Sequence, residues 1–548
     1  MRRGMAVFML AAAVLRAGDG VTPPRRLGAG ATERRLTLRQ AVEMAMRANL
    51  EVAIERTNLD TAGQAIGAAR GGFDPVMHWQ SQAADSNTPS PSMLQGPDGI
   101  LTTHAAGQTL AWHQKTPWNG LTVDAEFDAN RTTSADPYVS LSPFYSTDLA
   151  VTVTKPLLRG RTMDAERALV KIRRQDKAAS AAELEARAMD VAARVEQAYW
   201  DLVAARRRVD VDLEAASLAK TQLDQNRRMI AAGTLPPVEL PASEAELESR
   251  LDDLYRSTGQ VTEVEDVLKT LLARERQDPL WNEEIVPLDA RAADLPAVIE
   301  LADAEAEALA RRPELKQLDA NRAANQVVQR QNADLLKPRA DLVAGYTLAG
   351  LAGHIRAANP FTDALTPMYQ RVDALSAAAG LPAVAAPASG TLPASMAGGL
   401  GGSLNSLFRG NYQSVQAGVS FDFTVHNRAA EANLATAAIA SKRLQLMRAR
   451  AEQAIEAQVR DALQALDTAR QRMRAAEAGA RAAGEKLASE TRLFAAGGST
   501  NFLVLTRQNE YSAARRLVVD AETSLGKAVS RYHAAVGSTL AAWGMTVE

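Results

Sequence analysis

The chain carries the same apolar heptad pattern twice, and this internal duplication limits its fold more than any other feature. In the first copy, apolar residues recur at a strict seven-residue spacing, at Val195, Leu202, Val209, Ala216, Leu223 and Ile230. The second copy follows at an offset of 264 residues, at Val459, Leu466, Met473, Ala480, Leu487 and Phe494. The intermediate seam positions match as well, since Val191, Ala198, Ala205 and Ala219 fall on Ile455, Ala462, Ala469 and Ala483. Each copy therefore predicts a long coiled-coil helix, and a period of seven sustained this long predicts a left-handed supercoil.

After a short glycine-containing break, each copy begins a second heptad register. It runs through Leu240, Leu247, Leu254, Val261 and Leu268 in the first half, and through Val504, Tyr511, Val518, Leu525 and Tyr532 in the second. Each half therefore predicts a helical hairpin. The long helices are expected at 163–231 and 428–496, each about 69 residues and so ~100 Å long. The returning helices are expected at 238–272 and 502–536.

Shorter helices and a few strands precede each hairpin. Helices are expected at 36–70 and 301–336, each with the length needed to pack beside the rest of a long helix. Aromatic residues are concentrated in 73–160, and alternating apolar and polar residues predict strands near 121–127, 149–153, 340–348 and 414–423. The segment 349–411 is rich in Ala, Gly, Pro and Ser, which predicts a long loop with a short helix near 369–379.

The N-terminus is typical of a secretory signal. Met1-Arg2-Arg3 precedes an apolar stretch that runs to Leu15, although a frayed cytosolic N-terminus remains an alternative. The expected organisation is a signal peptide at 1–17, a linker at 18–35 and a first structural repeat at 36–273. An irregular connecting equatorial segment at 274–300 and a second repeat at 301–548, with the loop insert 349–411, complete the chain.

Composition argues against several classes of function. The 548 residues have a formal net charge of -2 and no cysteine. The chain therefore gives no general electrostatic reason to bind nucleic acid, and it can form no disulfide or thiolate metal site. Its histidines lack metal-ligand spacing, and it has neither a glycine-rich phosphate loop nor a serine-centred nucleophile elbow. We expect no enzyme activity, no cofactor and no metal.

These features together resemble the TolC family of outer-membrane efflux and secretion channels, over nearly the whole chain from Leu36 onward. The resemblance rests on Ala69-Arg70 followed by Pro75, on Lys-Pro-Leu-Leu-Arg-Gly at 155–160, on Arg312-Pro313-Glu314-Leu315, and on Ala-Ala-Gly before a hydrophobic helix start at both hairpin turns. The most specific motif is Ala-Ala-Gly-Gly-Ser-Thr-Asn-Phe-Leu-Val-Leu at 495–505, which is very similar to the second hairpin turn of that family.

The resemblance implies a mainly α fold with a β-barrel portion. In that family the duplicated coiled-coil hairpins form an α-barrel tunnel in the periplasm, and about four strands per chain contribute to a trimeric 12-stranded transmembrane β-barrel. It implies an outer-membrane location in a Gram-negative-type bacterium, among outer-membrane lipid. It also implies a periplasmic adaptor protein and, through the adaptor, an inner-membrane transporter. The implied function is the exit duct of a tripartite efflux pump or type I secretion system, which conducts small molecules or proteins passively.

The resemblance places the functional residues at the two hairpin turns. Adaptor docking is expected at Gly233, Thr234, Leu235, Gly497, Gly498, Ser499 and Thr500. These residues also suit ordinary turn and capping chemistry, which could be their only role. Some family members place aspartates around a closed aperture where this chain has Leu503 and Thr506, so Glu239 of the first half is the acidic candidate for the aperture.

Two other classes of protein also use long helical hairpins. A soluble scaffold made of a duplicated coiled coil would explain the heptads equally well, but it would not explain the secretory N-terminus, the aromatic strands and the turn motifs together. A periplasmic adaptor normally has one hairpin with a membrane anchor or lipid, whereas this chain has two hairpins and no cysteine. The aromatic residues of the strands suit either an ordinary core or a belt at the membrane boundary.

Overall fold

The computed structural model describes residues 21–26, 32–91, 99–136, 138–289, 298–356, 360–384 and 392–546. The described chain forms two units. The hairpin unit comprises Met1–Thr61, Lys177–Ala320 and Leu444–Glu548, and the sheet unit comprises Ala62–Asp176 and Asn321–Arg443. The expected signal peptide at 1–17 lies outside the described residues, as does part of the linker expected at 18–35.

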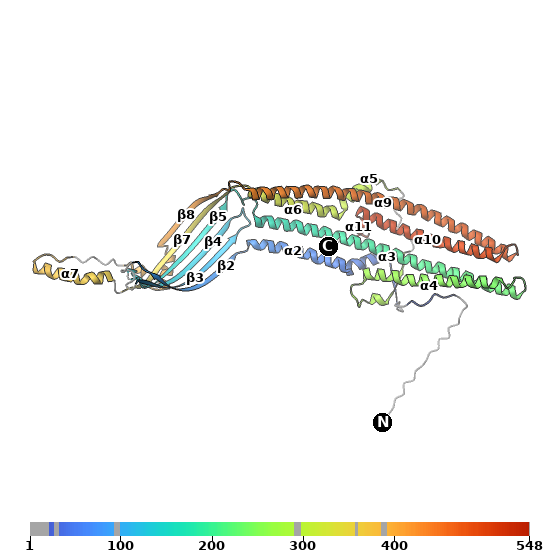
Figure 1. Ribbon diagram of the computed structural model, residues 1–548, viewed down its shortest axis with the longest axis horizontal. Helices are drawn as coiled ribbons and strands as arrows, with labels where there is room; N and C mark the ends of the chain where they lie inside the picture. Colours follow the sequence, from blue (N-terminus) through green and yellow to red (C-terminus); the bar gives the residue numbers. More distant parts are fainter. Residues whose placement is uncertain are drawn as a thin grey trace, which may run out of the picture. The chain divides into compact units, whose positions relative to one another are not determined.

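Two long helical hairpins confirm the central expectation from the heptads. Helix α3 (Ala165–Ala231) is followed by α4 (Glu239–Leu272), and α9 (Arg428–Ala495) is followed by α10 (Asn501–Val536). Each boundary lies within two residues of the predicted one. In the hairpin unit α4 runs back beside α3, and α10 runs back beside α9 (Figure 1). The seam residues Val195, Leu202, Val459 and Leu466 are all buried, as the period of seven requires.

Each short helix expected before a hairpin is instead two helices. The first pair is α1 (Leu38–Ala48) with α2 (Leu50–Arg70), and the second is α5 (Leu301–Arg311) with α6 (Pro313–Leu335). The first break occurs at Asn49, which is extended and whose Oδ1 accepts a hydrogen bond from the Glu51 amide at 2.9 Å. The second break occurs at Arg312, because a residue that precedes proline disfavours the helical conformation. The prediction of continuous helices at 36–70 and 301–336 is corrected accordingly.

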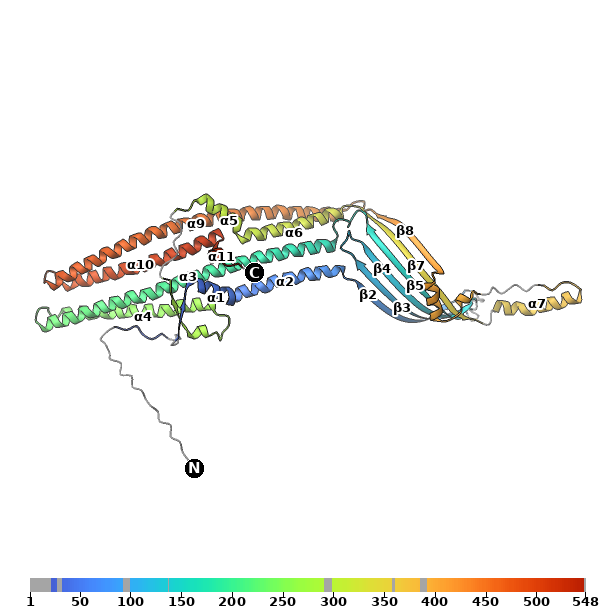
Figure 2. The ribbon, with the colours of Figure 1, turned by 180° about the vertical axis from the view of Figure 1, so that it is seen from behind.

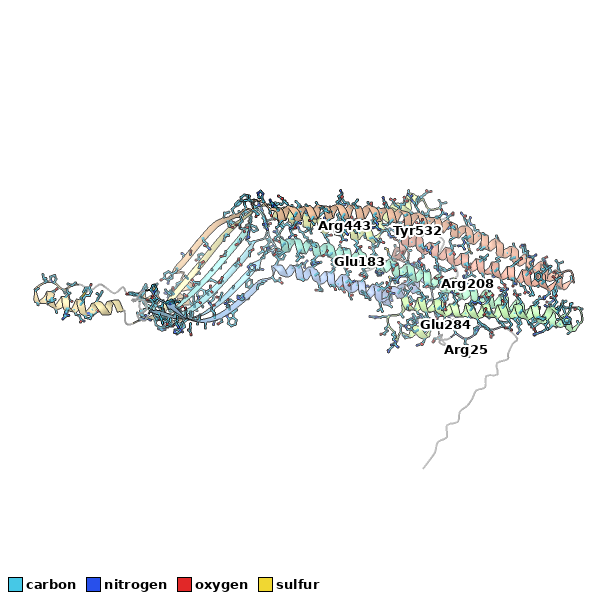
Figure 3. The ribbon with its side chains drawn as sticks, viewed as in Figure 1. Arg25, Glu183, Arg208, Glu284, Arg443 and Tyr532 are labelled. Atoms are coloured by element: carbon cyan, nitrogen blue, oxygen red, sulfur yellow. The ribbon has the colours of Figure 1, made fainter. Side chains whose placement is uncertain are left out.

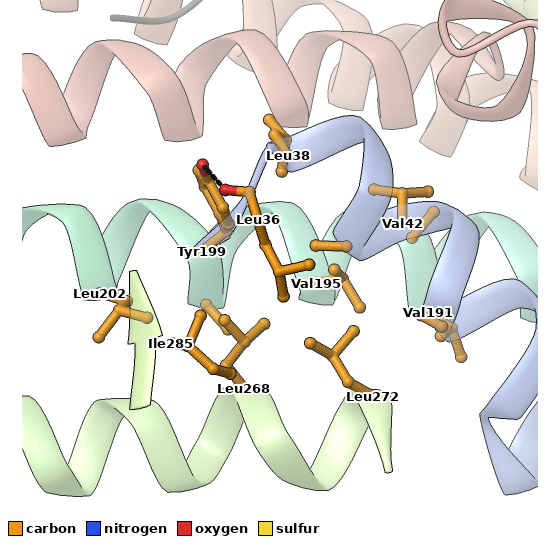
Figure 4. Close-up of a cluster of buried hydrophobic side chains, with 14 of the residues drawn as sticks. Leu36, Leu38, Val42, Val191, Val195, Tyr199, Leu202, Leu268, Leu272 and Ile285 are labelled. Atoms are coloured by element: carbon orange, nitrogen blue, oxygen red, sulfur yellow. Dashed lines mark hydrogen bonds between the residues drawn. The ribbon is translucent and has the colours of Figure 1, made fainter. Parts of the chain in front are cut away.

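The largest apolar cluster of the hairpin unit surrounds Tyr199 of α3. Leu36, Val195, Leu202 and Leu268 are buried around it (Figure 4). The Tyr199 hydroxyl donates to the Leu36 carbonyl at 3.0 Å and to Asp289 at 2.8 Å. Burial raises the pKa of Tyr199 well above its ordinary value, so this side chain stays a neutral donor. The cluster joins the start of the first repeat to its hairpin.

One strand of a small parallel sheet lies in the segment 274–300, which was expected to be irregular. Strand β1 (Glu33–Leu36) pairs in parallel with β6 (Glu284–Pro287), and a short 3-10 turn, η2 (Pro279–Asn282), precedes β6. Neither four-residue strand is long enough to show a periodic pattern in the sequence, so the pair was not predicted.

The sheet unit holds six antiparallel strands rather than about four. They are β2 (Val76–Pro89), β3 (Ile100–Lys115), β4 (Thr122–Ser134), β5 (Leu141–Pro156), β7 (Arg339–Ile355) and β8 (Tyr412–Asp422), and they pair in that order. The 3-10 turn η1 (Gly71–Phe73) links α2 to β2. Strands β4, β5, β7 and β8 contain the four predicted runs to within one residue. Strands β2 and β3 were not predicted because Ala, Gln and Thr interrupt their apolar alternation, and they correct the expected count.

The insert 349–411 is more ordered than its composition predicted. Strand β7 continues to Ile355, α7 (Pro360–Ala378) replaces the short helix expected near 369–379, and η3 (Ala394–Met396) and α8 (Leu400–Phe408) precede β8. The last helix of the described chain is α11 (Thr539–Ala542). Among the described residues, no helix combines the length and the apolar character needed to cross a membrane.

Candidate functional site

Both hairpin turns use the same hydrogen-bonded glycine motif. In the first turn, the Thr234 amide donates to the Met229 carbonyl at 2.9 Å and the Gly233 amide donates to Ile230 at 2.9 Å. In the second turn, Gly498 donates to Leu493 at 2.8 Å and Gly497 to Phe494 at 3.0 Å. Gly233 and Gly497 have φ of 72° and 77°, a left-handed conformation that glycine adopts without strain. The two glycines therefore end α3 and α9 in the same way.

The residues after these glycines begin the returning helices differently. Thr500 caps α10, and its side chain accepts a hydrogen bond from the Leu503 amide at 3.4 Å. The first turn has no equivalent side-chain cap before α4. Gly233, Thr234, Gly497, Gly498 and Thr500 are exposed, whereas Leu235 and Ser499 are half-buried. Both turns lie at the same end of the hairpin unit (Figure 2), so one partner could contact both.

A buried polar network joins the two hairpins just above their turns. The Asn226 side-chain amide of α3 donates to Ser243 Oγ of α4 at 2.7 Å and to Asn501 Oδ1 of α10 at 2.9 Å. Gln222 donates to Asn226 at 2.9 Å and to Asn501 at 3.3 Å. All four side chains are buried. Since buried polar groups are costly when unpaired, the network holds three helices in one relative position.

This network was not predicted, although its signal is present in the sequence. The seam series Val191, Ala198, Ala205 and Ala219 also passes through Asp212 and Asn226, which are polar. A polar residue at a seam position commonly specifies the register and partner of a coiled coil. Asp212 also has a partner in the other hairpin, because Arg516 of α10 donates to it at 2.9 Å.

Glu239, the acidic candidate for the aperture, belongs to the same network. It lies in the first turn of α4, and its Oε2 accepts a hydrogen bond from Asn501 at 3.2 Å. At the corresponding positions of the second hairpin, Leu503 and Thr506 carry no charge. Glu239 therefore binds the neighbouring hairpin, which the aperture assignment did not anticipate, and its role at an aperture stays a prediction.

Further along the hairpin unit, α3 and α10 pack closely and exchange ion pairs. A Cβ placed on Gly526 of α10 would lie 2.6 Å from the Trp200 ring of α3, so only glycine fits beneath that ring. The Arg208 side chain, labelled in Figure 3, pairs with Asp520 of α10, and Lys527 of α10 pairs with Asp201 of α3. The first hairpin is thus joined to the second mainly through these two helices.

The six-stranded sheet has one apolar face and one polar face. Because successive residues of a strand point to opposite faces, the strand register groups the side chains into cross-strand rows. One row contains Trp79, Leu110, Phe127, Leu149 and Leu348 and ends at Gln413 of β8. The next row contains Met77, Trp112, Ala125, Val151, Tyr346 and Val415. Trp79 is 66% exposed and Val415 is 75% exposed, so this face is not the core of the chain.

The opposite face of the same strands is polar and acidic. Its rows contain Asp124 with Thr152, Glu126 with Ala150, and Asp128 with Asp148. Thr109 of β3 donates to Asp128 at 2.5 Å, and His113 of β3 contacts Asp124 at 2.5 Å. Such a two-faced sheet suits a position between an apolar medium and water.

Within the described part of the chain, both outer strands of the sheet lack a partner on one side. β2 and β8 stand at the two ends of the strand order, and every residue of each strand is exposed. These edges are 14 and 11 residues long, far longer than the edges that water-soluble proteins usually tolerate. The helices α2 and α9, which adjoin these strands in the sequence, also expose apolar residues: Leu50, Ile54, Ile439 and Leu446.

A cleft of about 870 Å³ in the hairpin unit lies between residues 23–26, α3, α4 and β6. Arg26 of this N-terminal segment pairs with Glu265 at 2.6 Å and with Glu284 at 2.5 Å. Burial alone would raise the pKa of Glu265, but the hydrogen bonds that it accepts from Arg26, Ile285 and Lys269 outweigh burial and hold its pKa below the ordinary value. These contacts indicate that the cleft anchors the N-terminal segment.

No group of three or more His, Asp or Glu side chains among the described residues could hold a metal ion. His533 of α10 lies beside Tyr532, with ring centroids 5.7 Å apart, and its Nδ1 contacts Ser538 at 3.0 Å. Burial lowers the pKa of His533. These contacts indicate a packing role.

Comparisons with known proteins show the family and the fold. The family model described as outer membrane efflux protein matches residues 120–274 and 370–538, which is more than half of the chain. A crystal structure of CusC has a TM-score of 0.60 and 14% identity, over 94% of this chain and 99% of that chain. The CmeC outer-membrane channel of Campylobacter jejuni has a TM-score of 0.59 and 13% identity, over 92% of this chain and 86% of that chain. A membrane protein from Pseudomonas aeruginosa has a TM-score of 0.59 and 16% identity, over 91% of this chain and 90% of that chain. Among curated proteins, no sequence matches the chain.

Proposed function

Because this chain belongs to the outer membrane efflux protein family, we propose that it is the exit duct of a tripartite export system, either an efflux pump or a type I secretion system. Its resemblance to TolC-like channels is confirmed by the family model and by the fold. It is an outer-membrane protein with its helical part in the periplasm. The observation that carries the proposal is the six-stranded sheet, which has an apolar face, a polar face and two free edges.

The free edges support a homotrimer. Pairing β8 of one copy with β2 of the next satisfies both rows of backbone groups, and a closed ring of copies leaves no edge in lipid. Three copies of a six-stranded sheet form a barrel of eighteen strands, in place of the twelve that the resemblance implies. The apolar rows then face lipid and the acidic rows face the lumen. In a soluble scaffold, Trp79, Val415 and Phe421 would remain in water.

The exposed apolar residues of α2 and α9 support the same ring. Leu50 and Ile54 lie on the helix that leads into the edge strand β2, and Leu446 lies on the helix that leaves the edge strand β8. Ile54 is sixteen residues from the sheet end of α2, and Leu446 is eighteen residues from the sheet end of α9. These positions can therefore meet at about the same level between neighbouring copies.

Transport through this duct is proposed to be passive. The sequence has no nucleotide-binding loop, so a partner must supply the energy. The two glycine turns are proposed to contact the periplasmic adaptor, because they end both hairpins at one end of the hairpin unit and are largely exposed. The adaptor would in turn connect the duct to an inner-membrane transporter.

The assembly is tested by native mass measurement of detergent-solubilised protein. We expect a trimer, and we expect Leu446→Glu to weaken it by placing a charge in the interface. Ala182, the equivalent residue of α3, is buried within the chain, so Ala182→Gly serves as a comparison that perturbs folding without touching the interface. A stable water-soluble monomer would overturn the proposal.

Docking is tested by crosslinking to the adaptor in cells. Gly497→Val should reduce crosslinking because a β-branched side chain disfavours the left-handed conformation of Gly497. Gly498→Val should reduce it by obstructing the close approach of a partner. Gly380 is a suitable control because it also has a positive φ, of 71°, and a Cβ added there would have no atom within 4 Å, yet it follows α7 in the sheet unit. Normal crosslinking by both turn variants would remove the docking assignment.

A further inference from the structure

We propose that α8 is a lipid-contacting helix, which inserts Leu400, Leu404 and Phe408 among the acyl chains of the outer leaflet of the outer membrane. This inference rests on the proposed function, because it requires the apolar face of the sheet to meet lipid. It goes beyond that function by giving a membrane-binding role to a segment of the insert between β7 and β8.

Helix α8 is seated directly on the apolar face of the sheet. Ser403 Oγ shares a hydrogen bond of 2.8 Å with Thr147 Oγ1 of β5 and donates to the Gly350 carbonyl of β7 at 3.0 Å. Thr147 and Gly350 are register partners, two residues beyond the pair Leu149 and Leu348. By strand alternation they point to the same face as that apolar row.

The close approach of α8 depends on glycine. A Cβ on Gly350 would collide with the Ser403 backbone and would lie 2.9 Å from Leu407 Cβ. A Cβ on Gly402 of α8 would lie 3.1 Å from Ala352 Cβ. The sheet and the helix thus present small residues to each other, which fixes α8 at this height on the strands.

The exposed side of α8 differs from that of a helix on a water-soluble protein. The residues that it buries against the sheet are Ser403, Ser406 and Leu407, so two of the three carry hydroxyl groups. The residues that it turns outward at four-residue spacing are apolar, and Phe408 is 75% exposed while Leu400 is 43% exposed. A helix that buries two hydroxyl groups while it leaves large apolar side chains exposed suits a hydrocarbon environment.

A second stripe of α8 is more polar. Gly401, Asn405 and Arg409 follow Leu400, Leu404 and Phe408 by one residue each. An apolar stripe beside a polar one is the arrangement of a helix that lies in a membrane interface, with its polar stripe among the headgroups. Arg409 places a cation where phosphorylated headgroups would lie.

The sheet alone supplies a short apolar band at this position. On β5 the apolar face runs from Leu149 to Val153, which is five residues, whereas a transmembrane strand needs about 9 to 11. The next residues on that face of β5 and β7 are Thr147 and Gly350, and α8 covers both of them. The outward side chains of α8 therefore extend the apolar band. Because β7 begins after α6, this extension is at the end of the strands away from the periplasm, in the outer leaflet.

The test uses the absence of cysteine from the chain, which permits labelling at a single position. Single-cysteine variants Phe408→Cys, Leu400→Cys and Asn405→Cys are labelled with a small fluorophore and reconstituted in phosphatidylcholine vesicles. Quenching is measured with brominated acyl chains and with aqueous iodide. Val415→Cys, on the apolar face of β8, reports on the sheet itself.

We expect brominated chains to quench positions 400 and 408 at least about twofold more strongly than position 405, with the reverse order for iodide. If position 415 is quenched by brominated lipid but 400 and 408 are quenched only by iodide, α8 does not contact lipid and the proposed function stands. If brominated lipid quenches none of positions 400, 408 and 415, the proposed function fails as well. Because 400 and 408 are labelled independently, misfolding of one variant leaves the other to decide.

Discussion

Helices α3 and α9 carry the same heptad seam but have different surroundings. Trp200 of α3 is buried against Gly526 of α10, whereas Gln464, its equivalent at the offset of 264 residues, is exposed. Ala204 and Val211 of α3 pack with Val519 of α10, while Thr468, the equivalent of Ala204, is exposed. The duplication therefore specifies each hairpin, and a second apolar stripe, present only on α3, specifies how the two hairpins join.

The two repeats also differ in their strands and turns. The first repeat contributes β2 to β5, whereas the second contributes β7 and β8 with α8 between them. At the turns, the first repeat supplies Asn226, Ser243 and Glu239 to the buried network and the second supplies Asn501. Substitutions at equivalent positions should therefore have unequal effects, and matched pairs at the offset of 264 residues test this.

The largest difference is expected for Trp200→Ala compared with Gln464→Ala. Removing Trp200 leaves a cavity above Gly526, and loss of a buried tryptophan typically costs about 3 to 5 kcal/mol. Removing the exposed Gln464 should change stability by no more than about 0.5 kcal/mol. Thermal unfolding of the two variants in the same detergent measures the difference. Equal losses would mean that α3 and α9 have equivalent surroundings in the assembled protein.

Much of this asymmetry could not be predicted from the sequence. The heptads located the four long helices because a seam of period seven is a strong local signal. Strands β2 and β3 were missed because Ala, Gln and Thr can be accommodated in a strand whose neighbours supply the apolar residues. The break at Arg312 could have been predicted from Pro313, and the network could have been suspected from Asn226 at a seam position. The position of α8 on the sheet could not have been predicted, because it depends on a contact between Gly350 and Ser403, which are far apart in the chain.

A smaller difference is expected for Asn226→Ala compared with Glu490→Ala. Asn226 bonds to Ser243 and Asn501, so its loss leaves buried partners unpaired at a cost of about 1 to 3 kcal/mol. Glu490 contacts Ser499 and Arg507, both of its own hairpin. We therefore expect Asn226→Ala, and not Glu490→Ala, to loosen the contact between hairpins and to raise the frequency of channel opening in planar bilayers. Unchanged opening in the Asn226 variant would show that the network does not restrain the hairpins.

A stabilising effect is expected for Glu196→Gln. Burial raises the pKa of Glu196, although the nearby Ser530 hydroxyl and the Trp543 indole, which donates to Glu196 at 2.6 Å, lower the pKa in part. The folded state thus holds a proton more tightly than the unfolded state, so stability falls as pH rises from the ordinary value of 4.5 through the raised pKa. Glutamine keeps the acceptor for Trp543 and removes this loss, which should raise stability at neutral pH by roughly 1 kcal/mol.

The control for this effect is Arg460→Gln, at the equivalent position of α9. Arg460 is exposed and pairs with Glu305 at 2.8 Å, so its replacement should leave the pH dependence of unfolding unchanged. Thermal unfolding between pH 4 and pH 8 should then show a flatter profile for Glu196→Gln alone. A profile identical to that of the unaltered protein would mean that Glu196 is hydrated in the assembled channel.

The smallest effect is expected for Glu239→Gln, paired with Leu503→Glu at the equivalent position of α10. Glutamine still accepts the hydrogen bond from Asn501, so the network is kept and only charge is lost. In the proposed trimer the first repeat supplies at most three carboxylates to an aperture. Because so few charges are present and each accepts a hydrogen bond, their loss should change cation block of the closed channel by less than about twofold. Leu503→Glu would double the ring and should strengthen block more clearly. Single-channel conductance with added divalent cations measures both variants. Complete loss of block in Glu239→Gln would show that one repeat alone forms the selective ring, which would make the turns even less equivalent than the buried network indicates.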